Sequence, residues 1–147
     1  MNDEYYMSIA LQQAKMAESL DEVPVGAVLV NAEGEVIAKA HNLVRTLKDP
    51  TAHAEIIAIR EAAKLCGLKL TGVSIYVSME PCPMCSGAIV LSQMRRLIYA
   101  VPSPYGGAES LFNIVNNPYL NCQLEITAGC LEAQAKRIIK NFFLSKR

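Results

Sequence analysis

The stretch Val73-Ser74-Ile75-Tyr76-Val77-Ser78-Met79-Glu80-Pro81-Cys82-Pro83-Met84-Cys85 changes character twice along its length. Residues 73–79 are apolar and rich in β-branched side chains, which is typical of a buried strand. Pro81 and Pro83 then predict a turn that opens a helix, because proline is tolerated in a first helical turn but not inside a central strand. We therefore expect both cysteines at a helix N-terminus, just beyond the end of a buried strand.

Helices and strands alternate on either side of this stretch. Upstream, the patterns predict a helix over residues 3–20, a hairpin of strands 25–30 and 36–42 with a turn at 33–34, and a helix over 52–66 that ends at Gly67. Downstream they predict a helix to about residue 93, a strand at 97–101, a Pro- and Gly-rich loop at 102–107, a short helix over about 109–116, a brief strand at 124–126 and a last helix from about 131. One antiparallel pair followed by strands that alternate with helices predicts a mixed α/β sheet with helices on both faces.

Composition limits the classes of protein to consider. A chain of 147 residues, 52% hydrophobic, fits one domain over residues 1–147. Fourteen basic and fourteen acidic residues cancel, so no global field indicates nucleic acid or a membrane. The last stretch is nonetheless basic, and either a solvated helix face or a contact with a polyanion would explain its residues Lys136, Arg137, Lys140, Lys146 and Arg147.

The cell compartment follows from the N-terminus and the cysteines. The first residues are acidic where a signal peptide would be basic, and the longest apolar run, residues 23–30, is too short to span a membrane, so we expect a cytoplasmic protein without membrane contact. Five cysteines, an odd number, argue against a disulfide framework and for metal or free thiols. Cys66, Cys122 and Cys130 are most simply interpreted as small packing residues.

Cys82 and Cys85, together with His53 and Glu55, have the composition of a catalytic zinc site. Zinc that is held by three protein groups keeps its fourth position for water, and a neighbouring carboxylate can move the protons of that water. His53 and Glu55 are two residues apart, so they cannot both reach an ion on the flank of a helix, but they can if the ion lies beyond its end. We expect His53, Cys82 and Cys85 as ligands and Glu55 as general acid and base.

Two other interpretations use the same residues. A structural zinc site would close the fourth position with a further ligand from the set His41, Cys66, Cys122 and Cys130. A redox-active Cys-x-x-Cys pair is the second interpretation, but it gives no reason for the histidine and the glutamate.

The motif resembles that of the zinc deaminases that act on bases, which share His-x-Glu with Pro-Cys-x-x-Cys. The resemblance spans nearly the whole chain and points to the tRNA-specific adenosine deaminases within the cytidine deaminase-like superfamily. The matching segments are Pro24-Val25-Gly26-Ala27, Asn42, Asp49-Pro50-Thr51-Ala52-His53-Ala54-Glu55, Glu80 to Cys85, Ser110-Leu111 and Phe142-Phe143.

The resemblance implies a three-layer α/β/α sandwich with a five-stranded mixed sheet and one Zn²⁺ per subunit. It also implies hydrolytic deamination of adenosine to inosine at the wobble position of a tRNA anticodon, with a zinc-activated water and Glu55 as proton shuttle. The tRNA anticodon stem-loop would be the substrate, and the subunits would form a homodimer. The residues implied to contact the substrate are Val25, Asn42, Ala54, Tyr105, Phe142, Phe143 and Arg147.

The chain departs from this family in one loop. Family members generally carry an Asp and a Lys there, whereas residues 101–105 are Val-Pro-Ser-Pro-Tyr and carry no charge. Tyr105 offers a ring that could stack on a base in place of the charge. The departure keeps a second function open, which is deamination of a free base or nucleoside of the guanine or cytosine type. A non-catalytic, zinc-stabilised interaction module is a third.

Overall fold

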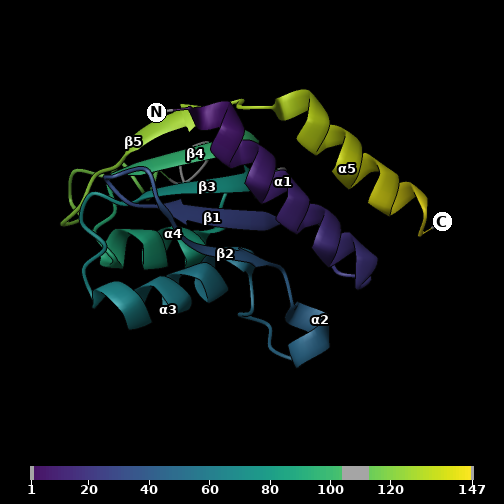
Figure 1. The fold of residues 1–147 in the computed structure, drawn as a ribbon, viewed down its shortest axis with the longest axis horizontal. Coiled ribbons are helices and arrows are strands. Elements are labelled where there is room, and N and C mark those ends of the chain that lie inside the picture. The colour runs from purple at the N-terminus through teal and green to yellow at the C-terminus, as the bar shows by residue number, and fades with distance from the viewer. Residues whose placement is uncertain (1, 104–112, 147) are drawn as a thin grey trace.

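The computed structural model describes residues 2–103 and 113–146, which form a five-stranded mixed sheet between two layers of helices (Figure 1). The helices are α1 (Asp3–Ser19), α2 (Val44–Leu47), α3 (Ala54–Cys66), α4 (Pro83–Leu91) and α5 (Glu132–Leu144). The strands are β1 (Gly26–Val30), β2 (Val36–His41), β3 (Ser74–Met79), β4 (Arg96–Val101) and β5 (Glu125–Ala128). The fold class expected from the sequence is confirmed.

The strand order in the sheet is β2-β1-β3-β4-β5. β1 is antiparallel to both β2 and β3, whereas β3, β4 and β5 are parallel to one another. Each parallel step needs a crossover, and α4 supplies the one between β3 and β4. The carboxyl ends of β3 and β4 therefore lie at the same edge of the sheet, which is where ligands bind in open α/β folds.

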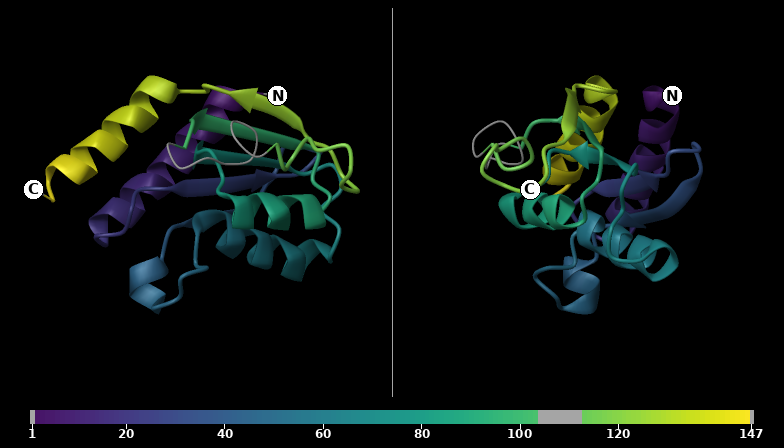
Figure 2. Two further views of the ribbon diagram at one scale, coloured as in Figure 1. Left: turned by 180° about the vertical axis from the view of Figure 1, so that it is seen from behind. Right: turned by 90° about the vertical axis from the view of Figure 1, so that its left-hand side faces the viewer.

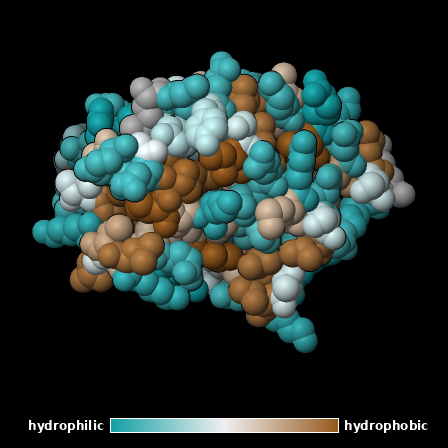
Figure 3. Space-filling view, in the orientation of Figure 1, coloured by the Kyte–Doolittle hydropathy of each residue, from teal (hydrophilic) through white to brown (hydrophobic). Residues whose placement is uncertain are grey.

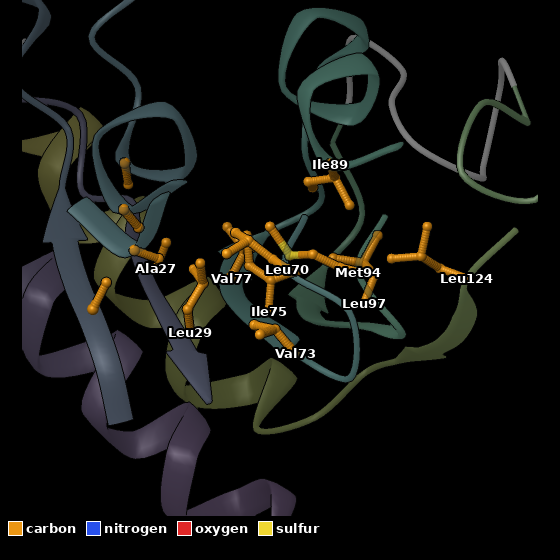
Figure 4. Packing of buried hydrophobic residues seen from close by; sticks show 14 of the residues in the cluster. Ala27, Leu29, Leu70, Val73, Ile75, Val77, Ile89, Met94, Leu97 and Leu124 are labelled. Carbon is orange, nitrogen blue, oxygen red and sulfur yellow. The ribbon is translucent and has the colours of Figure 1, made fainter. Parts of the chain in front are cut away.

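One helical layer is built from the two ends of the chain, and the other from its middle. α1 and α5 cover one face of the sheet, and α3 and α4 cover the other (Figures 1 and 2). On the α3 and α4 side, the core of large side chains is shown in Figure 4, where Leu29, Ile75 and Leu97 from three strands meet Leu70 and Met94. On the opposite side, Tyr76 and Ile98 of the strands pack against the apolar stripe of α1. Because both faces are covered, β3 is buried on both sides, as the mainly apolar run of 73–79 predicts.

α1 lies unusually close to the sheet at Gly26. A Cβ built at this position would lie 2.0 Å from the carbonyl oxygen of Ala10 and 2.7 Å from the backbone nitrogen of Ala14. The N–H group of Gly26 donates to the hydroxyl of Ser78 at 3.0 Å, which fixes the start of β1 against β3. The absence of a side chain at Gly26 therefore allows α1 to pack closely on the start of β1. Val25, which directly precedes β1, lines the cleft described below.

A polar network closes the opposite end of the sheet. Asp3, in the first turn of α1, accepts two hydrogen bonds from the guanidinium of Arg96 at 3.0 and 2.9 Å and one from the hydroxyl of Tyr76 at 2.8 Å. Arg96 also donates to the hydroxyl of Thr127 on β5 at 3.1 Å. Hydrogen bonds from Arg96 lower the pKa of Asp3. The network ties α1 to three strands of the sheet.

The structure corrects the expected elements in three places. The one-turn helix α2 is an addition, because its four residues are too few to show a helical period. Of the helix expected over 109–116, residues 109–112 lie outside the described residues, and 113–116 are not helical. β5 extends to Ala128, two residues beyond the expected end. No helix within 2–103 or 113–146 has the length and apolarity needed to cross a membrane.

Candidate metal centre and substrate cleft

Two helix N-termini meet where His53 and Cys82 lie. Each of these residues is the N-cap of its helix, α3 and α4 respectively, with extended backbone angles. Cys85 lies in the first turn of α4 and is fully buried. An N-cap side chain leaves the backbone before the helix begins, so His53 reaches beyond the end of α3, as the sequence argument requires. Glu55 then follows from within the first turn.

The three potential ligand atoms have the spacing of a tetrahedral zinc site. The Nδ1 atom of His53 lies 3.6 Å from the Sγ atom of Cys82 and 3.5 Å from that of Cys85, and all three atoms lie within 4.8 Å of one another. A sulfur at ~2.3 Å and an imidazole nitrogen at ~2.05 Å from one ion, at the tetrahedral angle, are separated by about 3.5 Å. The observed distances match this value, so one ion can contact all three residues.

The electrostatics of the thiols also suit a cation. A hydrogen bond from Cys85 and the neighbouring His53 lower the pKa of Cys82 to about 4, despite its partial burial. These contacts have the opposite effect on the two neighbours: the hydrogen bond with Cys82 raises the pKa of both Cys85 and His53. The lowered pKa favours the thiolate form of Cys82, and thiolate is the form that binds metal.

Glu55 is buried beside this group, with 3% of its surface exposed. Its Oε1 atom has no hydrogen-bond partner among the described residues. Burial raises the pKa of this carboxyl to about 7. A buried carboxylate oxygen without a partner is costly for the fold, and such groups occur where a ligand or ordered water completes the site. The donor set and this oxygen together fit a zinc ion that keeps one position for water.

No described residue stands ready as a fourth ligand. His41 instead pairs through Nδ1 with the side-chain oxygen of Gln13 at 3.0 Å. Cys122 donates to the carbonyl of Met94 at 3.5 Å, and Cys130 packs on the α1 and α5 side of the sheet. Cys66 is exposed at the end of α3, so its interpretation as a packing residue was wrong, whereas Cys122 and Cys130 are partly buried in the two cores.

A cleft of about 830 Å³ opens over His53, Cys82 and Glu55. One wall comes from residues 21–25 and the start of α2, the second from the ends of β3 and β4, and the third from the C-terminal half of α5. The side chains are drawn from segments far apart in the sequence, which meet at the carboxyl edge of the parallel strands. A cleft of this volume is of the usual size for small-molecule sites.

The residues expected to contact a base lie in this cleft. Val25 is half-buried and Asn42 is nearly buried on the wall that faces the metal centre. Among the described residues, the Asn42 side-chain amide makes two long hydrogen bonds, one to the carbonyl of Val23 and one from the N–H group of Val44, both at 3.4 Å. Ala54 is the first residue of α3, so its N–H group has no partner within the helix. All three expected positions are therefore brought together.

Glu22 shapes the same wall, although no local pattern in the sequence singles it out. Its carboxylate is 1% exposed and accepts from the N–H groups of Arg45 and Thr46 at 3.1 and 2.7 Å, and from the Thr46 hydroxyl at 2.8 Å. It thereby caps α2, whose own N-cap, Leu43, has no side-chain acceptor. These hydrogen bonds outweigh burial and lower the pKa of Glu22. Glu22 fixes the segment that follows Asn42.

Glu80 is a second buried carboxylate that sequence reasoning did not single out. It follows β3 directly, and its Oε1 atom accepts from the N–H group of Ser103 at 3.0 Å. Both residues line the cleft. The available signal was position, because polar residues at the carboxyl ends of parallel strands gather at one edge of the sheet.

The C-terminal helix brings aromatic and basic side chains to the mouth of the cleft. Phe142 is buried and Phe143 is 52% exposed, and their rings meet edge to face at 5.2 Å. Lys146 lies over the Phe142 ring, 5.3 Å from its centroid, and pairs with Asp21 on the opposite wall. Lys136 and Lys140 also line the cleft. The expected contacts Tyr105 and Arg147 lie outside the described residues.

The comparisons with known proteins agree with this geometry. Residues 1–101 match the family model of the cytidine and deoxycytidylate deaminase zinc-binding region. The chain is 46% identical to the tRNA-specific adenosine deaminase of Aquifex aeolicus, over 100% of this chain and 97% of that protein. A structure from a study of A-to-I editing by tRNA:A34 deaminases is 41% identical with a TM-score of 0.86, covering 91% of this chain and 98% of that one.

A second enzyme class also appears among the similar structures. The guanine deaminase of Bacillus subtilis is 41% identical with a TM-score of 0.65, over 69% of this chain and 66% of that one. The similarity to the tRNA deaminases extends further along both chains. With a three-ligand zinc centre and near-complete coverage, this chain belongs to the zinc-dependent cytidine and deoxycytidylate deaminase family, within the group of the tRNA-specific adenosine deaminases.

Proposed function

We propose that this enzyme deaminates adenosine to inosine at the wobble position of a tRNA anticodon. The observation that carries the proposal is one continuous cleft, which joins the buried Glu55 and the metal centre to the aromatic and basic side chains of α5. A free nucleoside needs only the inner part of this cleft. Exposed Phe143 and the lysines at the mouth suit the unstacked bases and phosphates of an RNA loop.

His53, Cys82 and Cys85 would hold the zinc ion, with one ion in each subunit. Zinc supplies, when bound, the activation of the water whose oxygen replaces the amine. Glu55 would take one proton from that water at its Oε1 atom, which has no partner among the described residues, and deliver it to the ring nitrogen. It would later carry the second proton, from the hydroxyl then bonded to the ring carbon, to the leaving amine. The carbon–nitrogen bond then breaks and ammonia leaves. The buried position of Glu55 keeps bulk water from competing for these protons.

The wall residues would orient the base. The Asn42 side-chain amide can exchange its long hydrogen bonds for shorter ones to the base, and the N–H group of Ala54, which lines the same cleft, would donate a further one. Val25 would provide an apolar surface against which the flipped base packs. Phe142, Phe143 and the neighbouring Arg147 would contact flanking nucleotides, with Tyr105 stacking from the uncharged loop.

The direct test is incubation of the zinc-loaded enzyme with a transcribed tRNA that carries adenosine at the wobble position. We expect inosine at that position and no other. The same enzyme is offered adenosine, the free bases guanine and cytosine, and the nucleosides of these two bases, and ammonia release is measured. If the free bases are turned over while the tRNA keeps its adenosine, the proposal is wrong.

The second candidate function is deamination of a free base such as guanine. The uncharged segment 101–105 and the similarity to a guanine deaminase favour it. It predicts that removal of the Phe143 ring has little effect on turnover, because a small base would not reach the mouth of the cleft. A non-catalytic zinc module, the third interpretation, predicts no ammonia from any substrate in the panel.

We also propose that the chain is a single cytoplasmic domain that forms a homodimer. Support for the dimer comes from the end of α3 and the turn after it, where Leu65 and Leu68 are exposed. Hydrophobic side chains gather over α3 on the face in Figure 3, at its lower left. Exposed apolar patches of this kind often mark protein interfaces. Light scattering should give twice the mass of one chain, and Leu68→Glu should shift that mass toward the monomer.

A further inference from the structure

Glu80 connects the two strands whose ends form the cleft. Its N–H group donates to the carbonyl of Val101 at 2.8 Å, which extends the parallel pairing of β3 and β4 beyond Met79 and Val101. Its side chain is 3% exposed, although it carries a carboxylate. Buried carboxylates are uncommon unless they have hydrogen-bond donors.

The backbone alone cannot continue this pairing. The next residues on the two segments are Pro81 and Pro102, and proline has no N–H group to donate. At this point the Glu80 Oε1 atom accepts from the N–H group of Ser103 at 3.0 Å. Ser103 is followed by another proline, so its N–H group is the one backbone donor that the sequence offers between residues 102 and 104. The Glu80 carboxylate thus takes the place of a backbone hydrogen bond between the two segments that the prolines cannot form.

This bond has a consequence for the cleft. Glu80 lies two residues before Cys82, so it belongs to the turn that carries a proposed zinc ligand. Val101 and Ser103 form part of the wall that faces the tail of α5. The hydrogen bond therefore links the position of residues 101–103 to that of the turn at residues 80–82, which carries Cys82. Charge-assisted bonds to a buried carboxylate are stronger and more directional than neutral ones.

We propose that Glu80 is a positioning residue, which holds residues 101–103 at a fixed distance from the metal centre so that they receive the nucleotide next to the reacting adenosine. This role rests on the proposed function, because a free base would not extend to that wall. Because the Glu80 carboxylate holds the backbone of residue 103, we expect its replacement to change substrate binding more than the chemical step.

The kinetic test compares Glu80→Ala with Glu80→Gln in the zinc-loaded protein. The glutamine keeps an oxygen that can accept from Ser103, whereas alanine removes the acceptor. With an anticodon stem-loop RNA we expect Glu80→Ala to raise KM by about 10- to 100-fold, the range for a lost hydrogen bond to a charged group, with kcat changed less than threefold. Glu80→Gln should recover most of that loss, and both proteins should hold one zinc. A loss confined to kcat, or no recovery by glutamine, would overturn the proposal.

A second measurement does not depend on the substrate. Hydrogen exchange at the Ser103 amide, followed by NMR, should be about 10- to 100-fold faster in Glu80→Ala and near the wild-type rate in Glu80→Gln. Unchanged exchange in Glu80→Ala would show that Glu80 does not hold the wall. If the wild-type enzyme fails on RNA but exchange responds as expected, the proposed function fails and the positional link stands.

The partner residue supplies the reciprocal variant. Ser103→Pro removes the donor and leaves the Glu80 carboxylate in place. If the two groups act through one bond, the effect of the double variant Glu80→Ala, Ser103→Pro on KM should be close to that of the larger single change. Effects that simply multiply would mean that Glu80 and Ser103 act separately and would contradict the proposal.

Discussion

Replacement of Glu55 by glutamine tests the proposed chemistry most directly. Glutamine keeps the size of the side chain and an acceptor oxygen but cannot take up a proton at neutral pH. The proposed zinc ligands are His53, Cys82 and Cys85, so we expect the variant to retain one zinc per chain and the wild-type fold. Its rate of inosine formation should fall sharply while the binding of RNA persists.

The structure sets the size of this fall. General acid–base groups contribute typically ~10²–10⁴-fold to rate, and Glu55 is proposed to move more than one proton. No described neighbour is placed to replace it, because backbone N–H groups of Thr46 and Ser103 engage the buried carboxylates of Glu22 and Glu80. We therefore expect the upper end, a loss of about 10⁴-fold, or about 5.5 kcal/mol in the activation barrier.

Single-turnover kinetics with excess enzyme measure the chemical step apart from product release, and zinc is determined on the same samples. The matched control is Glu61→Gln, on the same helix, whose exposed carboxylate pairs with Lys64 at 3.2 Å and lies outside the cleft. This control should react at the wild-type rate. A Glu55→Gln protein that holds zinc and keeps more than about one-tenth of the rate would refute the role assigned to Glu55. Loss of zinc instead would make Glu55 a ligand.

Three further variants test the fold and the mouth of the cleft. Gly26→Ala should lower the free energy of unfolding by about 2 kcal/mol or more in urea titrations, because the new methyl group would lie 2.0 Å from the carbonyl oxygen of Ala10 on α1. The matched control is Gly87→Ala, whose methyl group would have no atom within 4 Å and should not destabilise the chain. Asp3→Asn should lower the free energy of unfolding by about 1–2 kcal/mol at pH 7, because it weakens the hydrogen bonds from Arg96 that lower the pKa of Asp3. The stability that the Asp3 carboxylate contributes is present above the unfolded pKa of 3.8 and is lost as the pH falls through the lower folded pKa. Equal losses of unfolding free energy in the variant at pH 7 and pH 2 would therefore contradict the assignment. Phe143→Ala should reduce kcat/KM for stem-loop RNA by about 10- to 100-fold and change turnover of free adenosine far less, and equal effects on both substrates would place the ring elsewhere than on the RNA.

Local sequence was sufficient for the elements of the metal centre. The apolar run at 73–79 and the prolines after it specify a strand, a turn and a helix start, so Cys82 and Cys85 could be placed at a helix N-terminus without coordinates. The separation of His53 and Glu55 by two residues predicts an ion beyond a helix end, and the structure places His53 at the N-cap of α3, the position that this geometry needs. Such predictions succeed because they depend on backbone preferences within a few residues.

Other features could not be read from the chain because they join distant segments. Glu22 caps a helix 22 residues further on, and no local pattern distinguishes it from a surface glutamate. Glu80 could be placed after a strand, but its hydrogen bond with Ser103 joins residues that are 23 positions apart. The one-turn helix α2 cannot be predicted from the sequence either, since four residues are too few to show a helical period. The exposed Cys66 was misjudged because composition gives an average tendency to be buried and no position.

Residue types and short-range patterns along the chain were enough to predict the groups in the site, their order and the backbone positions from which they project. Three features became known only from the fold: His53 lies 3.6 and 3.5 Å from the two sulfurs, one oxygen of Glu55 is buried without a hydrogen-bond partner among the described residues, and α5 lines the same cleft. Short-range periodicity specifies local conformation, whereas the distances between segments follow from how the two helical layers pack on the sheet.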